Sequence, residues 1–406
     1  MDRPDKIPPV IKGLSMDLEN SEETICARGG WAPEFVTRPS SPPVYMTTAF
    51  DLDGLEQLDD LASARIAGYI YTRDGNPNHE AFASDMARLE GAESAVVCSS
   101  GMGAMTAVLL AHVKSGDHVI AGKVLYGRTG QMLNQLQSQF GVQVTFVDAL
   151  DPAAFHQAVT PGTKLAIIEN ISNPLMEVAD VPAIAAALGE IPLLVDSTFA
   201  TPVLQKPLAL GAQIVFHSAS KYLNGHGDVM MGVVAGKLST MRKVKAMMAL
   251  FGMNSNPYEC WLASRGLRTL PIRMERVSRS AAELSSYLLN HPKVRSVYYP
   301  GLESHPTHAI AQKLLPRGFG GMVAFELHGG RETVAKLFRS LGEIPFSPTL
   351  ADARTTVSYP TGTSHKFMTA ADREALGIRD GLVRLSVGLE DVNDLKQELE
   401  MALNAI

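Results

Sequence analysis

Short apolar runs alternate with helical stretches through the middle of this 406-residue chain. The apolar runs occupy residues 94–98, 117–122, 142–148, 164–170, 192–198 and 212–218. Residues 101–113 and 181–190, which lie between them, have the length and composition of helices. Continuous apolar strands that alternate with helices are typical of a mainly parallel sheet covered by helices on both faces. The pattern therefore predicts an α/β fold for this part of the chain.

A different pattern begins after about residue 270. Long amphipathic segments flank two apolar strands there, which predicts a smaller C-terminal α+β domain. The amphipathic segments are 278–290, 331–342 and 391–406, with Asp391 as a candidate N-cap, and the strands are 321–329 and 382–389.

We divide the chain into three parts: an N-terminal arm at 1–72, a large domain at 73–270 and a small domain at 271–406. Residues 1 to about 60 are rich in Pro, Ser and acidic residues and show little periodicity. Such a segment indicates an extended arm, and we expect it to contribute to a neighbouring subunit.

Composition narrows the class of protein. With 46% hydrophobic and 19% charged residues, the chain has enough apolar material for a large core. No segment has the roughly 18 unbroken apolar residues of a membrane span, and a net charge of −6 argues against nucleic acid as a partner. The first residues lack the apolar region of a secretory signal, so we expect a cytoplasmic protein. Three widely spaced cysteines, Cys26, Cys98 and Cys260, indicate neither a disulfide framework nor a metal site.

Three predicted strand ends carry unusual polar groups, and in an open parallel sheet ligands bind beyond the carboxyl ends of the strands. In "CSSGMGAM" a strand turns into a helix at Gly101 and Met102, so backbone N–H groups would point at an anion. In "VDSTFATP" the apolar strand ends at Asp196, which must be paired or hydrogen-bonded there. The glycines are also explained if they only allow the strand-to-helix turn, and Asp196 is also explained if it only caps a helix.

The third strand end, "HSASKY", places Lys221 directly after a buried strand. Desolvation and any cationic neighbour would lower the pKa of this amine and make it a candidate for covalent chemistry with a carbonyl. A surface lysine in a glycine-rich loop is the alternative. Together, however, the three strand ends supply a phosphate cradle that includes Ser218 and Ser220, an acid for a pyridinium nitrogen and an aldehyde-binding amine. Pyridoxal phosphate (PLP) requires these three groups of a protein.

With these three groups in order, the sequence resembles the Cys/Met-metabolism family of PLP enzymes, the cystathionine γ-synthase-like group. The resemblance extends from "YIYTRDGNPN" to "LVRLSVGLED" and is carried by motifs in the family's order, which include "SSGMGAM", "LYGRT", "ENISNPLMEVAD", "VDSTFATP" and "HSASKYLNGHGDV". It implies PLP fold type I (aspartate aminotransferase-like), a large mainly parallel sheet domain with a smaller C-terminal α+β domain. It also implies a homotetramer, a dimer of dimers with shared active sites.

The resemblance assigns roles to single residues. Tyr71 and Arg73 would reach the phosphate of a neighbouring subunit's cofactor, Tyr126 would stack on the cofactor ring and act as acid or base, and Asn173 would lie near the phenolic oxygen. Lys221 would be the Schiff-base lysine and proton shuttle.

Two further assignments concern the substrate. Arg384 would hold the substrate α-carboxylate in a bidentate fork, unless it only pairs with Glu390 or Asp391. The segment "LADARTTVSYPTGTSH" is similar to the sulfhydrylase version of the family, which places Thr355 near the substrate carboxylate and makes cystathionine a poorer candidate substrate.

The implied reaction is γ-elimination on a γ-substituted L-amino acid, through an external aldimine and a vinylglycine-type intermediate. Arg128 would line the side-chain pocket and select a polar or acidic leaving group, or it pairs with an acid such as Asp74. A γ-replacement synthase of the O-acetyl- or O-succinylhomoserine sulfhydrylase type would use the same residues, so it remains the alternative. A catalytically silent PLP-binding module is a more remote one.

Overall fold

The computed structural model describes residues 39–366 and 368–406. The chain separates into two units, Met1–Pro43 and Val44–Ile406, and the second holds the helices and strands of the fold. Most of the predicted N-terminal arm, together with Cys26, lies outside the described residues, and the domain boundaries drawn from the sequence remain predictions.

A seven-stranded sheet forms the large domain, in the order β1-β7-β6-β5-β4-β2-β3. Strand β7 runs antiparallel to both of its neighbours, β1 and β6, whereas the remaining pairs are parallel. The strands are β1 (Ser94–Cys98), β2 (His118–Gly122), β3 (Gln143–Val147), β4 (Thr163–Glu169), β5 (Leu193–Asp196), β6 (Ile214–Ser218) and β7 (Gly232–Gly236). The prediction of a mainly parallel sheet is confirmed, although β7 was not predicted.

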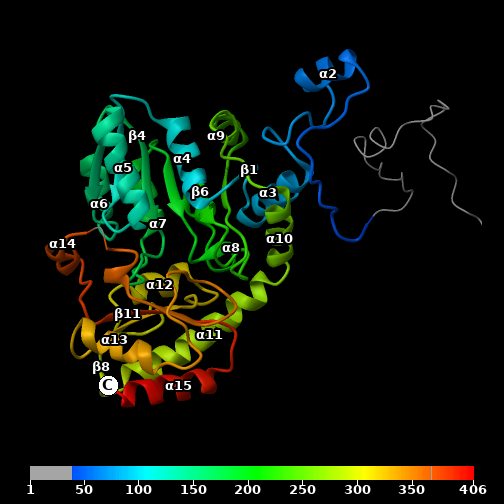
Figure 1. Ribbon diagram of the computed structural model, residues 1–406. Helices are drawn as coiled ribbons and strands as arrows, with labels where there is room; N and C mark the ends of the chain where they lie inside the picture. The colour runs from blue at the N-terminus through cyan, green and yellow to red at the C-terminus, as the bar shows by residue number, and fades with distance from the viewer. Residues whose placement is uncertain (1–38, 367) are drawn as a thin grey trace, which may run out of the picture. The chain divides into compact units, whose positions relative to one another are not determined.

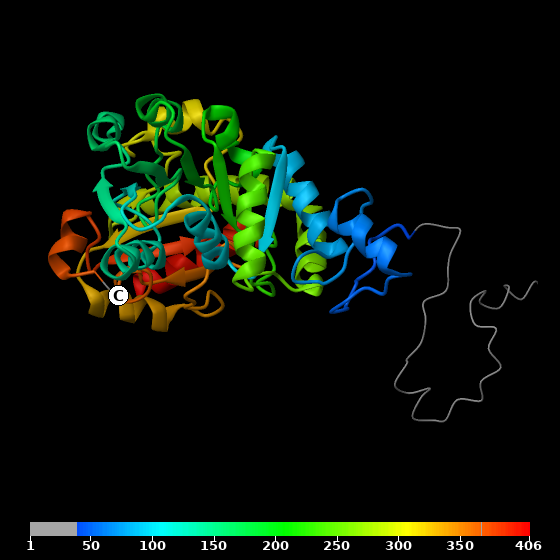
Figure 2. The same cartoon turned by 90° about the horizontal axis from the view of Figure 1, so that it is seen from above.

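Helices cover both faces of this sheet, as Figure 2 shows from above. Alternate residues of β4 enter two separate cores: Leu165 and Ile167 pack with α4, α5 and α9, and Ala166 and Ile168 pack with α6 and α7. This alternation is what a strand buried on both sides requires. The helices of this part are α2 (Leu55–Ala62), α3 (Pro77–Glu90), α4 (Gly101–His112), α5 (Gly127–Phe140), α6 (Pro152–Ala158), α7 (Val181–Leu188), α8 (Thr201–Leu204), η1 (Pro207–Leu210), α9 (Leu238–Leu250) and α10 (Pro257–Leu267).

The small domain contains a four-stranded antiparallel sheet in the order β10-β11-β9-β8. Helices α11, α13 and α15 pack against it through one apolar cluster (Figure 1), and Asp391 caps α15 as predicted. The elements are α11 (Leu270–Leu289), β8 (Val294–Tyr298), α12 (His308–Leu314), β9 (Met322–Leu327), α13 (Arg331–Ser340), β10 (Thr356–Ser358), η2 (Pro360–Gly362), α14 (Ala370–Ala375), β11 (Leu382–Ser386) and α15 (Val392–Asn404).

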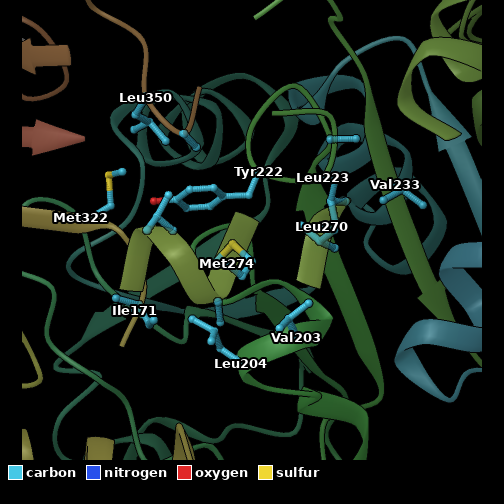
Figure 3. Close-up of a cluster of buried hydrophobic side chains, with 14 of the residues drawn as sticks. Ile171, Val203, Leu204, Tyr222, Leu223, Val233, Leu270, Met274, Met322 and Leu350 are labelled. Carbon is cyan, nitrogen blue, oxygen red and sulfur yellow. The ribbon is translucent and has the colours of Figure 1, made fainter. Parts of the chain in front are cut away.

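One further core cluster joins the two domains beneath the end of β6. Tyr222 follows Lys221 directly and is 2% exposed, and Figure 3 shows Met322 and Leu350 of the small domain near the hydroxyl end of its ring. Because Tyr222 is packed from both domains, the backbone that carries Lys221 rests on a dense apolar base.

Candidate active site

A cavity of about 590 Å³ lies at the carboxyl ends of β4, β5 and β6. This is the edge of the sheet where the sequence predicts a ligand. Ten of the predicted site residues line the cavity, namely Gly101, Met102, Tyr126, Arg128, Asn173, Asp196, Ser218, Ser220, Lys221 and Arg384. The cavity therefore brings together residues from both domains and from segments spread over most of the chain.

Lys221 enters this cavity immediately after β6. Its Nζ lies 3.4 Å from the Thr349 hydroxyl. Burial, and after it the nearby charge of Arg384, lowers the pKa of Lys221 from 10.5 to about 8. A substantial fraction of this amine is therefore neutral near physiological pH, as the sequence predicts and as attack on a carbonyl requires.

The start of α4 forms one wall of the cavity and fits a phosphate. Ser100 is the N-cap, and its hydroxyl accepts the Gly103 N–H at 2.9 Å. The backbone N–H groups of Gly101 and Met102, which precede Gly103, have no partner within the helix, so they can bind an anion. A Cβ on Gly101 would lie 3.2 Å from Ser218 Cβ, so this glycine lets the first turn of α4 approach the end of β6. The predicted cradle residues are thus close together.

Asp196 ends β5 and presents one carboxylate oxygen to the cavity. Its Oδ1 accepts the Thr198 N–H at 3.0 Å and the Thr198 hydroxyl at 2.6 Å. Burial raises the pKa of Asp196, and these two hydrogen bonds act against that rise. The alternative role as a helix cap is wrong, because α8 begins at an Ala200 N-cap with no side-chain hydrogen bond. A carboxylate held through one oxygen suits the ring nitrogen of PLP.

Arg384 reaches the cavity from β11 of the small domain. Its side chain is 2% exposed, and Nη1 donates to Asn173 Oδ1 at 2.9 Å. Within residues 39–366 and 368–406, its Nε has no hydrogen-bond partner. Burial lowers the pKa of this guanidinium to about 10. A buried cation with an unused donor is the group that a substrate carboxylate would satisfy.

The alternative partners of Arg384 are engaged elsewhere. Glu390 accepts the N–H and the hydroxyl of Thr355, at 2.5 and 2.8 Å, and Asp391 caps α15. The same contacts bear on Thr355, which is 1% exposed and absent from the cavity lining among the described residues. The structure does not bring Thr355 to the site, because Glu390 and the Gly388 N–H already occupy its hydroxyl.

Tyr71 and Arg73 also lie away from the cavity. The Arg73 guanidinium stands 5.1 Å from the centre of the Tyr71 ring and 3.6 Å from Asp74. Tyr71 is 40% exposed and the Arg73 side chain 52%, so both residues lie on the surface of the chain.

Arg128 lies in the first turn of α5 and lines the cavity, where its Nη1 donates to Gln131 at 3.1 Å. A cation is electrostatically unfavourable at a helix N-terminus. Helix stability therefore does not explain its presence there.

Sequence reasoning missed several polar residues of the cavity lining, among them Thr198 and Glu169. Thr198 orients Asp196 and also accepts the Ser218 N–H at 2.9 Å. Glu169 ends β4 beside Asp196 and lines the cavity. The signal for both was available, because each is a polar residue at or just after the end of a buried strand.

The cavity thus offers what PLP needs: a helix N-terminus and two serines for the phosphate, a carboxylate oxygen for the ring nitrogen and an amine with a lowered pKa. Arg384, whose Nε has no hydrogen-bond partner among the described residues, adds a group for a substrate carboxylate.

Comparisons with known proteins agree with this description. The family model described as Cys/Met metabolism PLP-dependent enzyme matches residues 23–404. The chain is 42% identical over 395 residues to L-methionine gamma-lyase of Porphyromonas gingivalis, with 96% of this chain and 99% of that protein covered. It is 41% identical over 399 residues to O-succinylhomoserine sulfhydrylase of Pseudomonas aeruginosa, with 97% and 98% covered.

A solved structure of cystathionine gamma synthase from Xanthomonas oryzae pv. oryzae, in complex with aminoacrylate and cysteine, has a TM-score of 0.85 to this chain. It is 34% identical, and the match covers 90% of this chain and 93% of that one.

Proposed function

The chain belongs to the Cys/Met metabolism PLP-dependent enzyme family, and on that premise we propose that it is a γ-lyase for a γ-substituted L-amino acid with a polar leaving group. Its relatives are enzymes of γ-elimination and γ-replacement that use pyridoxal phosphate. The observation that carries the proposal is Arg384, a buried arginine with an unused donor that lies near the Lys221 amine. That pair suits an α-amino acid held by its carboxylate next to a base.

The roles follow from the geometry. PLP supplies an electron sink for the bonds at the substrate α-carbon, and Asp196 would hold its ring nitrogen. Arg384 would fix the α-carboxylate, and with it which bond of the α-carbon is oriented for cleavage. Lys221 would remove and return protons, since its lowered pKa is suited to that task near neutral pH. Tyr126 lines the same cavity, and its phenol would protonate the leaving group. The net reaction consumes water and gives a 2-oxo acid, ammonia and the protonated γ-group.

Arg128 supports the choice of a polar leaving group. Its guanidinium would bind an anionic or hydrogen-bonding distal group better than a plain thioether. The variant Arg128→Gly should shift substrate preference toward apolar γ-groups and leave cofactor affinity intact, and Arg128→Lys should restore part of the original preference. An unchanged preference in Arg128→Gly would refute this assignment.

The alternative is a γ-replacement synthase, which the likeness to an O-succinylhomoserine sulfhydrylase favours. Mass spectrometry of products from the purified holoenzyme separates the two, with O-acetylhomoserine, O-succinylhomoserine, methionine, cystathionine and canavanine as substrates. Formation of 2-oxobutyrate and ammonia without added thiol supports the lyase. Turnover that requires a thiol and yields a new thioether or homocysteine identifies the synthase. A protein that binds PLP and converts none of these compounds would be the silent binding module.

We also propose a cytoplasmic homotetramer in which each active site is shared. The exposed positions of Tyr71 and Arg73, away from their own cavity, support a role in a neighbouring subunit. Subunits carrying Tyr71→Phe and Lys221→Ala should recover activity when mixed, because one site of each heterodimer is intact. Demonstrated subunit exchange with no recovery would contradict a shared site.

A further inference from the structure

Glu169 is a cavity-lining carboxylate to which no role has yet been given. It ends β4 and pairs in register with Asp196 on β5, so the two carboxylates stand side by side on the same face of the sheet. Burial and the charge of Asp196 both raise the pKa of Glu169. Burying a second carboxylate beside Asp196 is unfavourable, so hydrogen bonds to Glu169 must compensate for its burial.

One of these contacts is with the start of α5. Glu169 Oε1 accepts the backbone N–H of Tyr126 at 2.5 Å. Tyr126 is the N-cap of α5, yet its side chain makes no capping hydrogen bond, and the first turn of the helix contains no acidic residue. Glu169 thus supplies from another strand the hydrogen-bond acceptor that the helix N-terminus lacks in its own sequence. It thereby fixes the backbone from which the Tyr126 ring projects into the cavity.

The other contact is with the loop after β4. The backbone of Asn173 lies close enough to Glu169 to act on its carboxylate, and it lowers the pKa of Glu169. The Asn173 side chain in turn accepts from Arg384 Nη1 at 2.9 Å. One carboxylate therefore connects the backbone of Tyr126 to that of Asn173, and through Asn173 to the arginine of the small domain.

We propose that Glu169 is a positioning residue that holds Tyr126 and Asn173 at a fixed separation around the bound cofactor. It acts through their backbones and touches neither the substrate nor the reacting atoms. The inference rests on Tyr126 and Asn173 as cofactor contacts, and it does not depend on which reaction the enzyme catalyses.

The first test compares Glu169→Gln with Glu177→Gln. Glutamine keeps the length and one acceptor oxygen but replaces the other oxygen with an amide donor, which cannot bind a backbone N–H. Glu177 is a matched control, because it is a partly buried carboxylate in the same loop that bonds Ser172 and does not line the cavity. The measurements are the induced circular dichroism of bound PLP and its dissociation constant, both without any amino-acid substrate.

For Glu169→Gln we expect at least half of the induced signal to be lost and PLP to bind about tenfold more weakly, which is the effect of one lost hydrogen bond of about 1.4 kcal/mol. Far-ultraviolet circular dichroism should stay unchanged, and Glu177→Gln should match the wild type. If Glu169→Gln also keeps the wild-type signal and affinity, the proposal is wrong. Because no substrate is present, this outcome is independent of whether the protein is a lyase.

A double-mutant cycle tests the route through Tyr126. The effect of Glu169→Gln on the cofactor signal should largely disappear in a Tyr126→Ala background, because the ring to be positioned is gone. Additive effects would overturn the proposed route. If Glu169→Gln does not fold, Glu169→Asp replaces it: the shorter carboxylate keeps both acceptors, so it should fold and show an intermediate signal. A wild-type signal from Glu169→Asp would count against a positional role.

Discussion

Replacing Arg384 by methionine should remove substrate binding while changing the stability of the apoprotein little. Arg384 is 2% exposed, and burial lowers its pKa from 12.5 to about 10. At about 1.4 kcal/mol for each tenfold change, the folded protein holds this cation at a cost of about 3 kcal/mol. Methionine would relieve that cost but lose the hydrogen bond to Asn173, which contributes about 1.5–3 kcal/mol. The two effects nearly cancel, so the free energy of unfolding should change by less than about 1.5 kcal/mol.

Arg273→Met is the matched control. Arg273 is also buried, at 6% exposed, and burial likewise lowers its pKa to about 10. Unlike Arg384, it donates to the backbone carbonyls of Tyr222 and Gly266, at 2.7 and 2.8 Å. Arg273→Met would relieve a similar cost of about 3 kcal/mol, but it removes four hydrogen bonds, which include those to Leu223 and Thr269, at about 1.5–3 kcal/mol each. This variant should therefore be destabilised by about 3 kcal/mol or more.

The assay is urea unfolding of each apoprotein at one fixed protein concentration, followed by kcat/KM of the reconstituted enzyme. Loss of a buried charge pair with the substrate carboxylate corresponds to about 2–5 kcal/mol. We therefore expect kcat/KM of Arg384→Met to fall by about 30-fold or more. The reasoning is refuted if Arg384→Met is destabilised as much as Arg273→Met, or if kcat/KM falls by less than about tenfold.

Three further predictions concern the lysine, the aspartate and the phosphate cradle. The rate at which PLP attaches covalently to the apoprotein should rise about tenfold per pH unit below about pH 8 and level off above it, because only the neutral Lys221 amine would react. The rate is measured by stopped-flow absorbance, and a profile that levels off near pH 10 would contradict the lowered pKa. Thr198→Val removes both the hydroxyl bond to Asp196 and the acceptor for a backbone N–H, so PLP should bind about tenfold more weakly by fluorescence titration, whereas Thr198→Ser should bind normally. Gly232→Ala would place a Cβ against the Ser100 carbonyl oxygen, so it should lower both the unfolding midpoint and the affinity for phosphate. Wild-type values for both would show that the cradle accommodates the added methyl group.

Much of the fold can be predicted from local patterns in the sequence. The inner strands β2, β4, β5 and β6 are largely apolar because they are buried on both faces, so their positions can be read from composition alone. Strands β7, β8 and β10 were not predicted. In β7 the apolar run "VVA" lies between two glycines, and β10 is three residues long, so neither has a pattern that separates it from a loop.

The lowered pKa of Lys221 was predicted from the sequence. An amine that follows a buried strand can be desolvated or lie on the surface, and in the structure burial and the charge of Arg384 lower its pKa. The place of Asp196 at a strand end predicted a paired or hydrogen-bonded acid, and the structure shows Thr198 as its partner.

The tertiary structure alone decided which distant side chains meet. Arg384 and Asn173 are 211 residues apart in the sequence and are joined by one hydrogen bond, and Thr355 bonds Glu390 instead of reaching the cavity. Glu169 lies 43 residues from Tyr126, and only the packing of α5 beside β4 gives that carboxylate its partner. The burial of a single strand or helix leaves a hydrophobic pattern in its own sequence, so it can be predicted locally. A hydrogen bond across the site depends on how separate elements are placed together.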